Sequence, residues 1–393
     1  MPNRPDVRRR KREERPEGAL EMFATTSAGL EDVLAEELRR LGAAAVVPGA
    51  RGAAFAGDLK LAYRANLGLR TAHRVLLRIA TFGAKDRQAL YDGVRAVAWD
   101  AHLDLDTTLA VDAVSNRSGM THTQFVSRVV KDGVVDWFRD RCGRRPSVDP
   151  KAPDLQLNAR IVDDTCTLSW DTSGERLHRR GYRPSFGAEA PLKETLAAGV
   201  LLLSGYTGAA PLVDPMCGTG TLLVEAALIA KNIAPGLLGR RFGLERHPSF
   251  DRLLWNNARA EAREAVREVD GVPIRGSDLS EEAVRATAAA LRGAGVDDIV
   301  AVRRAKLGDL PRLEPPGSLV TNPPYGERLG DLSQLGALYA ELGDVLKHRC
   351  AGLTAHVLTA SKFLAGKIGL HTERRDALWN GALECRLLHF KLY

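Results

Sequence analysis

The chain has 393 residues and a net charge of +7, enough length for two or three domains of about 100–200 residues each. No apolar run approaches the roughly 20 residues that a bilayer-spanning helix needs, so we expect no membrane partner. The five cysteines form no C-x-x-C pair and no cluster with histidine, which predicts neither disulfides nor a metal site and indicates a reducing cytoplasm.

The first half of the chain predicts an α+β fold behind a basic tail. Residues 1–20 are charged and nearly without apolar side chains, so we expect a disordered tail. Residues 21–171 mix strands and helices without β-α-β regularity, which is typical of two small α+β subdomains. Expected helices lie near residues 30–41, 58–67 and 126–138, and expected strands at 21–26, 74–82, 155–162 and 166–170, the last two paired around Asp163-Asp164.

From about residue 186 the pattern changes to strands alternating with helices, which predicts a parallel, doubly wound α/β sheet. The expected strands are 211–214, 272–278, 298–304, 318–322 and 353–360; the expected helices are 189–203, 221–231, 250–269, 280–292 and 332–346. Two further apolar runs flank Asn380-Gly381, the strongest two-residue hairpin signal. A parallel sheet that finishes in an antiparallel hairpin resembles the class I methyltransferases that use S-adenosyl-L-methionine (SAM).

The first motif that carries chemistry is LVDPMCGTGTLLVEAALIA, residues 212–230. An apolar strand ends in Asp214 and runs into Gly218-Thr219-Gly220, which open a helix. Glycines let the backbone approach a ligand closely and turn tightly into the helix. Leu223 holds the place of the third glycine of the dinucleotide fingerprint, which argues against NAD. A lone G-x-G is most often an ordinary turn, but an Asp at the strand end favours a ligand site.

The second motif is Asp278, which ends the next strand of the sheet. An acidic side chain at this place can accept two hydrogen bonds from a ribose diol. The alternative is an N-cap for the helix that starts near Ser280, and both roles are compatible.

The third motif is LVTNPPYGERLG, residues 319–330. Pro323 and Pro324 each fix φ near about −65° and restrict the residue before them, so Asn322 is held still. Its oxygens can accept hydrogen bonds from an exocyclic amino group, and Tyr325 offers a flat face on which a base can stack. A plain Pro-Pro turn is the alternative. Because it follows the two other motifs along the chain, this motif predicts methylation of an amino nitrogen. That reaction needs positioning and electrostatic stabilisation rather than a cysteine nucleophile.

These motifs, together with APLKETLAA (residues 190–198) and APGLLGRRFGLE (residues 234–245), resemble the THUMP-domain guanine-N2 RNA methyltransferases, and most of all the bacterial RlmL type that acts on 23S ribosomal RNA. SGERLHRRGYR (residues 173–183) extends the resemblance into the first half, so that it covers about residues 21–393. It implies the following organisation: a ferredoxin-like segment at 21–65, a THUMP RNA-binding domain at 66–171, a linker at 172–188 and a Rossmann-like SAM methyltransferase domain at 189–393.

Carried over position by position, the resemblance implies that the target guanine is held by Asn322, Pro323, Pro324 and Tyr325. It implies that SAM is bound by Asp214, Pro215, Cys217, Gly218, Gly220, Asp278, Asn322, Lys193 and Glu194. In this family the THUMP region binds RNA, and basic runs in this chain are placed to hold phosphates, through Arg144, Arg145, Lys151, Arg176, Arg179, Arg180 and Arg183.

The chain departs from the family at Lys306, where relatives place an Asp beside the adenine; Asp309 follows three residues on. The fused members carry a second methyltransferase domain that makes 7-methylguanosine, which we do not expect here. Three alternatives stay open: the same chemistry on transfer RNA, a glutamine or DNA adenine methyltransferase, and an RNA-binding protein with an inactive SAM site. The THUMP-like half argues against the second. The sequence gives no prediction of the oligomeric state.

Overall fold

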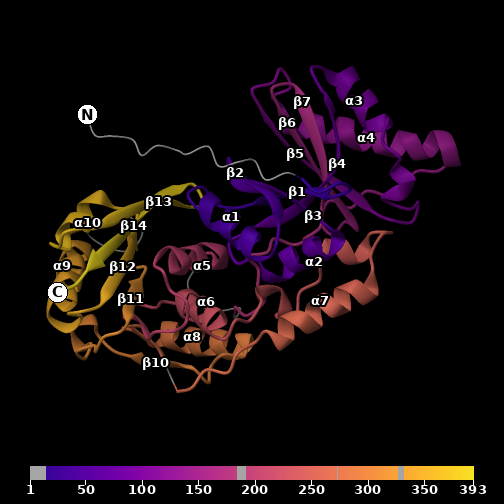
Figure 1. Ribbon diagram of the computed structural model, residues 1–393. Coiled ribbons are helices and arrows are strands. Elements are labelled where there is room, and N and C mark those ends of the chain that lie inside the picture. Colours follow the sequence, from indigo (N-terminus) through magenta and orange to yellow (C-terminus); the bar gives the residue numbers. More distant parts are fainter. Residues whose placement is uncertain (1–14, 184–191, 272, 326–331) are drawn as a thin grey trace.

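The computed structural model describes residues 15–183, 192–271, 273–325 and 332–393, which fold around two seven-stranded sheets (Figure 1). One sheet is built by the first half of the chain and the other by the second half. The expected order, an α+β half followed by a doubly wound half, is therefore confirmed. None of the helices described is long and apolar enough to cross a membrane.

The N-terminal sheet is formed by β1 (Leu20–Thr25), β2 (Ala44–Gly49), β3 (Gly52–Gly57), β4 (Arg74–Gly83), β5 (Leu109–Asn116), β6 (Leu155–Val162) and β7 (Thr165–Asp171). The strand order is β2-β3-β1-β4-β7-β6-β5. Neighbours pair antiparallel except β5 and β6, which are parallel. The helices of this half are α1 (Glu31–Arg40), α2 (Leu59–Gly68), α3 (Arg87–Arg95), the 3-10 turn η1 (Trp99–Ala101) and α4 (Thr123–Cys142).

Alternating side chains give this sheet one buried face. Met22 and Ala24 of β1, Phe55 of β3 and Leu157 of β6 join one core cluster with the apolar sides of α1 to α4. The expected turn between β6 and β7 is confirmed: Asp163 and Asp164 both take positive φ, 49° and 54°, as a two-residue hairpin turn requires.

Besides the helix α3, which was not predicted, three features of the first half differ from the sequence prediction. The strands β2, β3 and β5 were not predicted; β3, for example, reads GAAFAG and has few of the β-branched residues that mark a strand. β4 pairs with β1 on one side and β7 on the other, so the two expected subdomains share one sheet. The end of the expected disordered tail is ordered, because Leu20 begins β1 and Arg15 pairs with Glu21; residues 1–14 lie outside the described residues.

The C-terminal sheet is formed by β8 (Leu212–Asp214), β9 (Ile274–Asp278), β10 (Val300–Arg304), β11 (Ser318–Thr321), β12 (Thr354–Thr359), β13 (Arg374–Asn380) and β14 (Leu383–Lys391). The order is β10-β9-β8-β11-β12-β14-β13, with β8 to β12 parallel and β14 antiparallel to both of its neighbours. Its helices and 3-10 turns are α5 (Glu194–Leu203), α6 (Thr221–Ala230), η2 (Pro235–Leu237), η3 (Gly243–Arg246), α7 (Arg252–Glu264), α8 (Glu281–Ala294), η4 (Leu307–Asp309), α9 (Leu332–Arg349) and α10 (Lys362–Lys367).

This sheet confirms the predicted parallel core and terminal hairpin. The turn itself lies one residue later than expected, because Asn380 pairs with Leu383 and the turn residues are Gly381 and Ala382, with Gly381 at φ 68°. The strand order reverses between β8 and β11. In open α/β sheets, ligands bind beyond the carboxyl ends of the strands at such a switch point.

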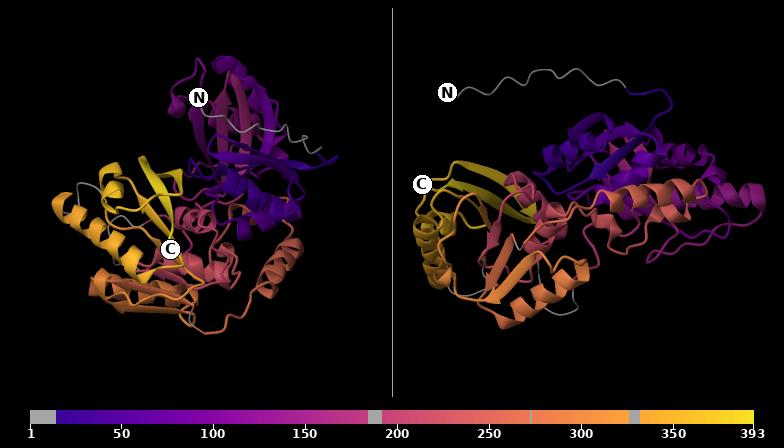
Figure 2. Two further views of the ribbon diagram at one scale, coloured as in Figure 1. Left: turned by 60° about the vertical axis from the view of Figure 1, so that its left-hand side comes forward. Right: turned by 60° about the horizontal axis from the view of Figure 1, so that its bottom comes forward.

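The two halves are joined by more than a linker (Figure 2). Within the expected linker, Leu177, Arg180 and Tyr182 are buried. The insert that carries α7 packs on α2, and its Trp255 belongs to the core cluster of the N-terminal half. Trp255 meets Tyr63 edge to face with ring centroids 5.5 Å apart. The methyltransferase-like half thus places one of its side chains inside the other half's core.

Candidate active site

The three motifs meet at the carboxyl ends of β8, β9 and β11. The hydroxyl of Thr321, at the end of β11, donates to Asp214 Oδ1 at 2.7 Å. The backbone N–H of Gly218 donates to Asp278 Oδ2 at 2.9 Å. Hydrogen bonds therefore join the end of β8 to both of its neighbours, and they place the glycine turn between the two carboxylates.

Asp214 is the most deeply buried acid of this group, with 1% of its surface exposed. Burial raises its pKa to about 7, against the lowering effect of the Thr321 hydroxyl and the Met216 N–H. Nearby Asp278 adds a further rise, because two carboxylates close together resist double ionisation. A cationic ligand group at this point would compensate a charge that the protein leaves poorly solvated.

The glycine turn has the shape of a ligand cradle. Gly218 takes φ +54°, and a Cβ built there would meet no atom within 4 Å, so its outer side is open space. Gly220 takes φ +78°, and a Cβ there would lie 2.5 Å from the methyl group of Thr287. Thr287 also donates to the carbonyl of Gly218 at 2.9 Å. The turn is thus held tightly from inside while its backbone stays approachable from outside, which fits the methionine part of SAM.

Asp278 is not the N-cap of α8. Ser280 has that role, because its hydroxyl accepts from the N–H of Ala283 at 3.2 Å. Asp278 Oδ1 accepts from the N–H of Ser280 at 2.9 Å, and the carboxylate is half-buried beside the glycine turn. The alternative interpretation of Asp278 as a helix cap is therefore wrong, while its place at the strand end suits a ribose diol.

Asn322 presents a buried acceptor that has no partner among the described residues. It follows β11 directly, and its side-chain oxygen Oδ1 is fully buried and accepts no hydrogen bond from the part of the chain that the structure describes. A buried amide oxygen left unpaired costs about 1–3 kcal/mol, so such atoms are uncommon unless a ligand completes them. Pro323 is buried and Pro324 half-buried, which fixes the chain on one side of this oxygen. The rest of the motif, residues 326–330, lies outside the described residues.

Tyr325 is anchored at its hydroxyl end by the terminal hairpin. The Cys385 thiol of β14 approaches the phenol oxygen at 3.8 Å, and the half-buried ring packs against the cores on both sides of the sheet. Burial raises the pKa of Tyr325 above its ordinary value, so the phenol stays neutral. The ring is thus oriented by the hairpin rather than left free.

The remaining predicted SAM contacts are placed less directly. Pro215 and Cys217 are buried in the turn after β8, and burial raises the pKa of the Cys217 thiol, which favours its protonated form. Lys193 precedes α5 and is half-buried. Glu194 is buried and its Oε1 lies 2.5 Å from Arg183 Nε. Lys306 and Asp309 are both exposed at η4, and the Lys306 N–H donates to Asp309 at 3.4 Å.

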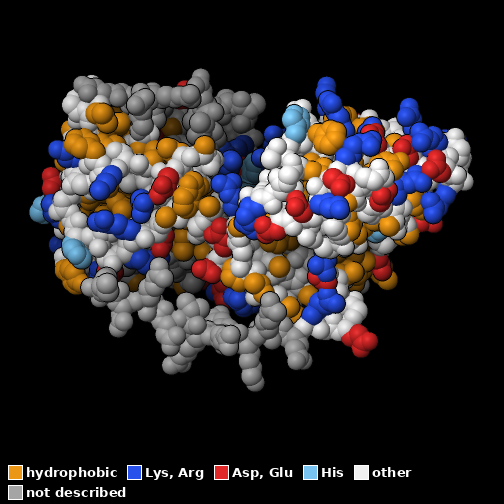
Figure 3. Space-filling model, turned by 90° about the horizontal axis from the view of Figure 1, so that it is seen from above, with side chains coloured by type: hydrophobic (Ala, Val, Ile, Leu, Met, Phe, Trp, Pro, Cys, Tyr) orange, Lys and Arg blue, Asp and Glu red, His pale blue; other side chains and the backbone are white. Residues whose placement is uncertain are grey.

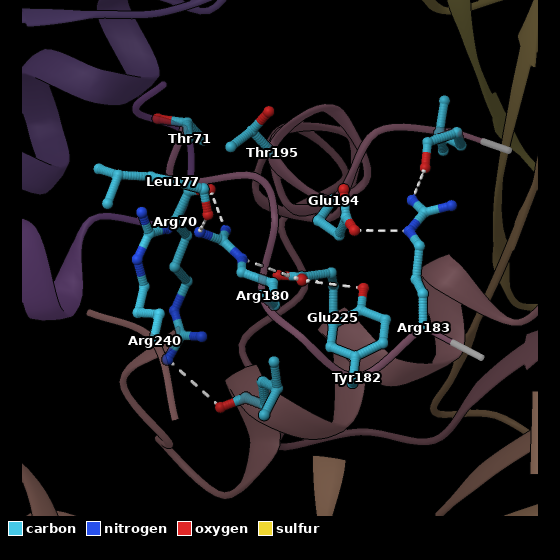
Figure 4. A network of polar contacts seen from close by, with 12 residues as sticks. Arg70, Thr71, Leu177, Arg180, Tyr182, Arg183, Glu194, Thr195, Glu225 and Arg240 are labelled. Carbon is cyan, nitrogen blue, oxygen red and sulfur yellow. Dashed lines mark hydrogen bonds and ion pairs between the residues drawn. The ribbon is translucent and has the colours of Figure 1, made fainter. Parts of the chain in front are cut away.

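Arg180, predicted to hold RNA phosphates, is instead buried at the junction of the two halves (Figure 4). Its guanidinium donates to the carbonyls of Leu177 at 2.7 Å and Arg70 at 2.6 Å, and it lies 3.4 Å from Glu225 of α6. Only 2% of its surface is exposed. The prediction for Arg180 is wrong, because its side chain points into the protein and its guanidinium is paired there.

The other predicted phosphate contacts fall into two groups. Arg144, Arg145 and Lys151 are exposed after the C-terminus of α4. Arg176 and Arg179 are exposed near the junction, whereas Arg183 is half-buried in its pair with Glu194. Figure 3 shows basic and acidic side chains interspersed over the face seen from above, with Lys and Arg also along the hollow between the two lobes. Within the described chain, no group of three or more His, Cys, Asp or Glu side chains can hold a metal.

The sequence analysis missed two residues, one that connects the motifs at the strand ends and one that pairs with Arg180 at the junction of the two halves. Thr321 joins two strand ends through Asp214, and nothing in its local pattern distinguishes it from other strand residues. Glu225 lies inside TLLVEAALIA, and a lone acid in an apolar helix signals a buried partner. This pattern could have predicted that α6 packs against a buried basic side chain.

A family model for the RMKL-like methyltransferase domain matches residues 180–389, more than half of the chain. The chain belongs to this family. Models for the RlmL ferredoxin-like domain and for the THUMP domain match residues 21–76 and 84–171. The expected resemblance to THUMP-domain, SAM-dependent methyltransferases is therefore confirmed at the level of the family.

Similar proteins and a similar solved structure agree with this assignment. The chain is 46% identical over 383 residues to the ribosomal RNA large subunit methyltransferase K/L of Syntrophotalea carbinolica, with 95% of this chain and 54% of the relative covered. It is 41% identical to a putative RNA methyltransferase of Synechocystis sp., with 94% and 96% covered. The crystal structure of a putative methyltransferase complexed with SAH superposes with a TM-score of 0.87 at 31% identity, covering 96% of this chain and 99% of that one. The chain thus spans about half the length of the K/L relative.

Proposed function

We propose that this protein methylates the exocyclic N2 amine of a guanine in 23S ribosomal RNA, with SAM as the methyl donor. The observation that carries the proposal is the buried Oδ1 of Asn322, which has no partner among the described residues and directly follows Thr321, the residue that joins the end of β11 to Asp214. An amino group that donates to this oxygen would satisfy the buried side-chain acceptor that the described part of the motif leaves unpaired. The names of the K/L relatives support ribosomal RNA as the substrate class.

The cofactor site is supported by residues from two strand ends. Gly218 and Gly220 would receive the methionine part, because the backbone there is open to a ligand. Asp214 would face the ammonium group of the methionine part. That positive charge would lower the pKa of Asp214, which burial raises. Asp278 would accept from the ribose hydroxyls. When bound, SAM supplies an electrophilic methyl group on a sulfonium.

The chain's own contribution is to hold and prepare the amine. The guanine amine is conjugated with its ring and is a poor nucleophile, so its hydrogens must be accepted as the nitrogen becomes pyramidal. Asn322 Oδ1 is fixed by the prolines and by its place at the end of β11, so it needs no reorganisation to accept one of them. Tyr325, oriented by the hairpin, would stack on the base. The base must leave any duplex first, because the amine of a paired guanine is occupied.

The test is methyl transfer from labelled SAM to two unmodified transcripts, 23S ribosomal RNA and a transfer RNA pool, with nucleoside mass spectrometry of the product. We expect N2-methylguanosine in the ribosomal transcript. If N2-methylguanosine formed only in transfer RNA, the proposed reaction would stand and the proposed ribosomal RNA substrate would be wrong. Failure to bind SAM by calorimetry would favour the RNA-binding protein with an inactive site, for which the exposed Lys306 near β10 is the motivating residue.

A further inference from the structure

The tip of the terminal hairpin extends beyond the sheet that it closes. β14 pairs with β12 as far as Arg386, where β12 ends. β13 and β14 continue to pair with each other past that point, from Leu378 opposite Cys385 to Asn380 opposite Leu383. A two-stranded ribbon is only marginally stable by itself, so this tip needs contacts from other parts of the protein to hold one position.

The N-terminal half supplies such contacts, just before α1. Gly29 lies so close to β13 that a Cβ built on it would overlap the carbonyl oxygen of Ala377 and would lie 3.2 Å from Cδ2 of Leu378. The next residue, Leu30, is fully buried in the same core cluster as Leu378, within the methyltransferase half. Figure 1 shows the hairpin reaching the start of α1. The backbone of the first half is therefore seated directly on the hairpin tip.

Leu30 is also fixed from its other side. A Cβ built on Gly199 of α5 would lie 2.6 Å from both methyl carbons of Leu30, so the leucine rests on the helix backbone there. Leu196 and Val200 of α5 belong to the same core cluster. Protein interiors are close-packed and transmit displacements, so the hairpin tip follows the position of Leu30.

The same hairpin tip holds the ring of Tyr325. The Cys385 thiol lies 3.8 Å from the phenol oxygen, and the side chain of Asn380 forms a hydrogen bond with the phenol. Cys385 is the cross-strand partner of Leu378, and both side chains are fully buried. The contact with the N-terminal half and the contact with Tyr325 therefore lie on paired residues of one narrow ribbon.

We infer that Leu378 is a positioning residue, through which the N-terminal half orients Tyr325 toward the target base. The inference rests on the proposed function, because that function assigns Tyr325 to the base. It gives the N-terminal half a part in the methyl-transfer step, since its seat on the hairpin completes the site that holds the base. Loss of packing at Leu378 or Leu30 should therefore lower kcat and leave the affinities for SAM and RNA in place.

The first experiment measures methyl transfer to the ribosomal transcript by the full-length protein, below the unfolding transition of each variant. Leu378→Ala and Leu30→Ala should each lower kcat about 10- to 100-fold, because a small misplacement at a reaction site costs that much. In a Tyr325→Ala background the same changes should lower kcat less than about twofold, because residues that act through one another are not additive. Leu378→Met keeps the volume and should restore kcat. The matched control is Leu90→Ala, which empties an equally buried site on α3 and should leave kcat unchanged.

The second experiment needs neither SAM nor RNA. The protein is labelled with meta-fluorotyrosine, and the fluorine resonance of Tyr325 is assigned by its loss in Tyr325→Phe. Leu378→Ala and Leu30→Ala should shift or broaden this resonance, and Leu90→Ala should not; if Leu378→Ala fails to fold, Leu378→Val should give a smaller change of the same kind. An unchanged resonance, or equal losses of kcat with and without the Tyr325 ring, would overturn the inference and leave the proposed reaction intact. A shifted resonance in a protein that methylates no guanine would support the positioning role and refute the proposed function.

Discussion

The buried pair of Arg180 and Glu225 allows the sharpest test of how the two halves are joined. Arg180→Met keeps most of the apolar volume but removes donors to two carbonyls, those of Leu177 and Arg70, and to the carboxylate of Glu225. Glu225 would then keep the Tyr182 hydroxyl, at 3.2 Å, as its donor. Its second oxygen, Oε2, already lacks a partner.

The expected cost is large because the remaining carboxyl group is buried. Removing one partner of a buried ion pair destabilises by about 3–5 kcal/mol. Burial already raises the pKa of Glu225, and Arg180 and Arg70 offset part of that rise. Without Arg180, which lowers the pKa of Glu225, that pKa should rise further and the buried carboxyl group should take up a proton more readily. The loss of stability should therefore become smaller as the pH falls.

The assay is urea unfolding followed by tryptophan fluorescence, with RNA binding measured in parallel. We expect a loss of about 3–5 kcal/mol for Arg180→Met and unchanged RNA affinity below the unfolding transition. The exposed neighbour gives a matched control, since Arg179→Met should change stability by less than about 0.5 kcal/mol. The double variant Arg180→Met/Glu225→Leu should regain much of the loss. A small stability change together with weakened RNA binding would refute this reasoning and restore Arg180 as a phosphate contact.

Three further predictions concern the motifs. Asn322→Ala should lower kcat at least about 100-fold, as removal of an oxyanion-type contact does, with SAM and RNA affinity unchanged; equal loss of binding would mark Asn322 as structural. Asp278→Asn should weaken SAM binding by calorimetry about tenfold while methyl transfer at saturating SAM changes less, and an unaltered affinity would remove Asp278 from the site. Since the pKa of Asp214 is raised from 3.8 to about 7, the apo fold should lose stability as pH rises through that window; Asp214→Asn should flatten urea midpoints between pH 5 and 8, and an unchanged slope would contradict the raised pKa.

Much of the catalytic half could be predicted from the sequence, because its signals are local. A strand that ends in Asp214 before Gly218 and Gly220 contains its own turn chemistry, and Asn380-Gly381 marks a hairpin to within one residue. Parallel strands then bring separate motifs to one edge of a sheet without further information. The arrangement of the motifs at that edge could therefore be predicted from the sequence.

The interior connections could not be predicted, because they depend on distant partners. Nothing beside Arg180 in RLHRRGYR distinguishes it from its exposed neighbour Arg179; only the position of Glu225 on α6 does. The strand β3 lacks β-branched residues and is stabilised by pairing with β1 and β2. Local propensity is a weak guide where the partner strand supplies the energy.

The placement of Trp255 limits how this protein can be engineered. A chimera that exchanged the first half for that of another RNA-binding protein would keep Phe250 beside the Trp255 indole but would remove Tyr63, the aromatic neighbour that the first half supplies. Such an exchange should join the two parents at three places, after the first half, before η2 and after α7, so that the segment from η2 to α7 travels with the first half despite lying within the second half's sequence. Recombination within this family therefore has to respect a boundary that is discontinuous along the gene.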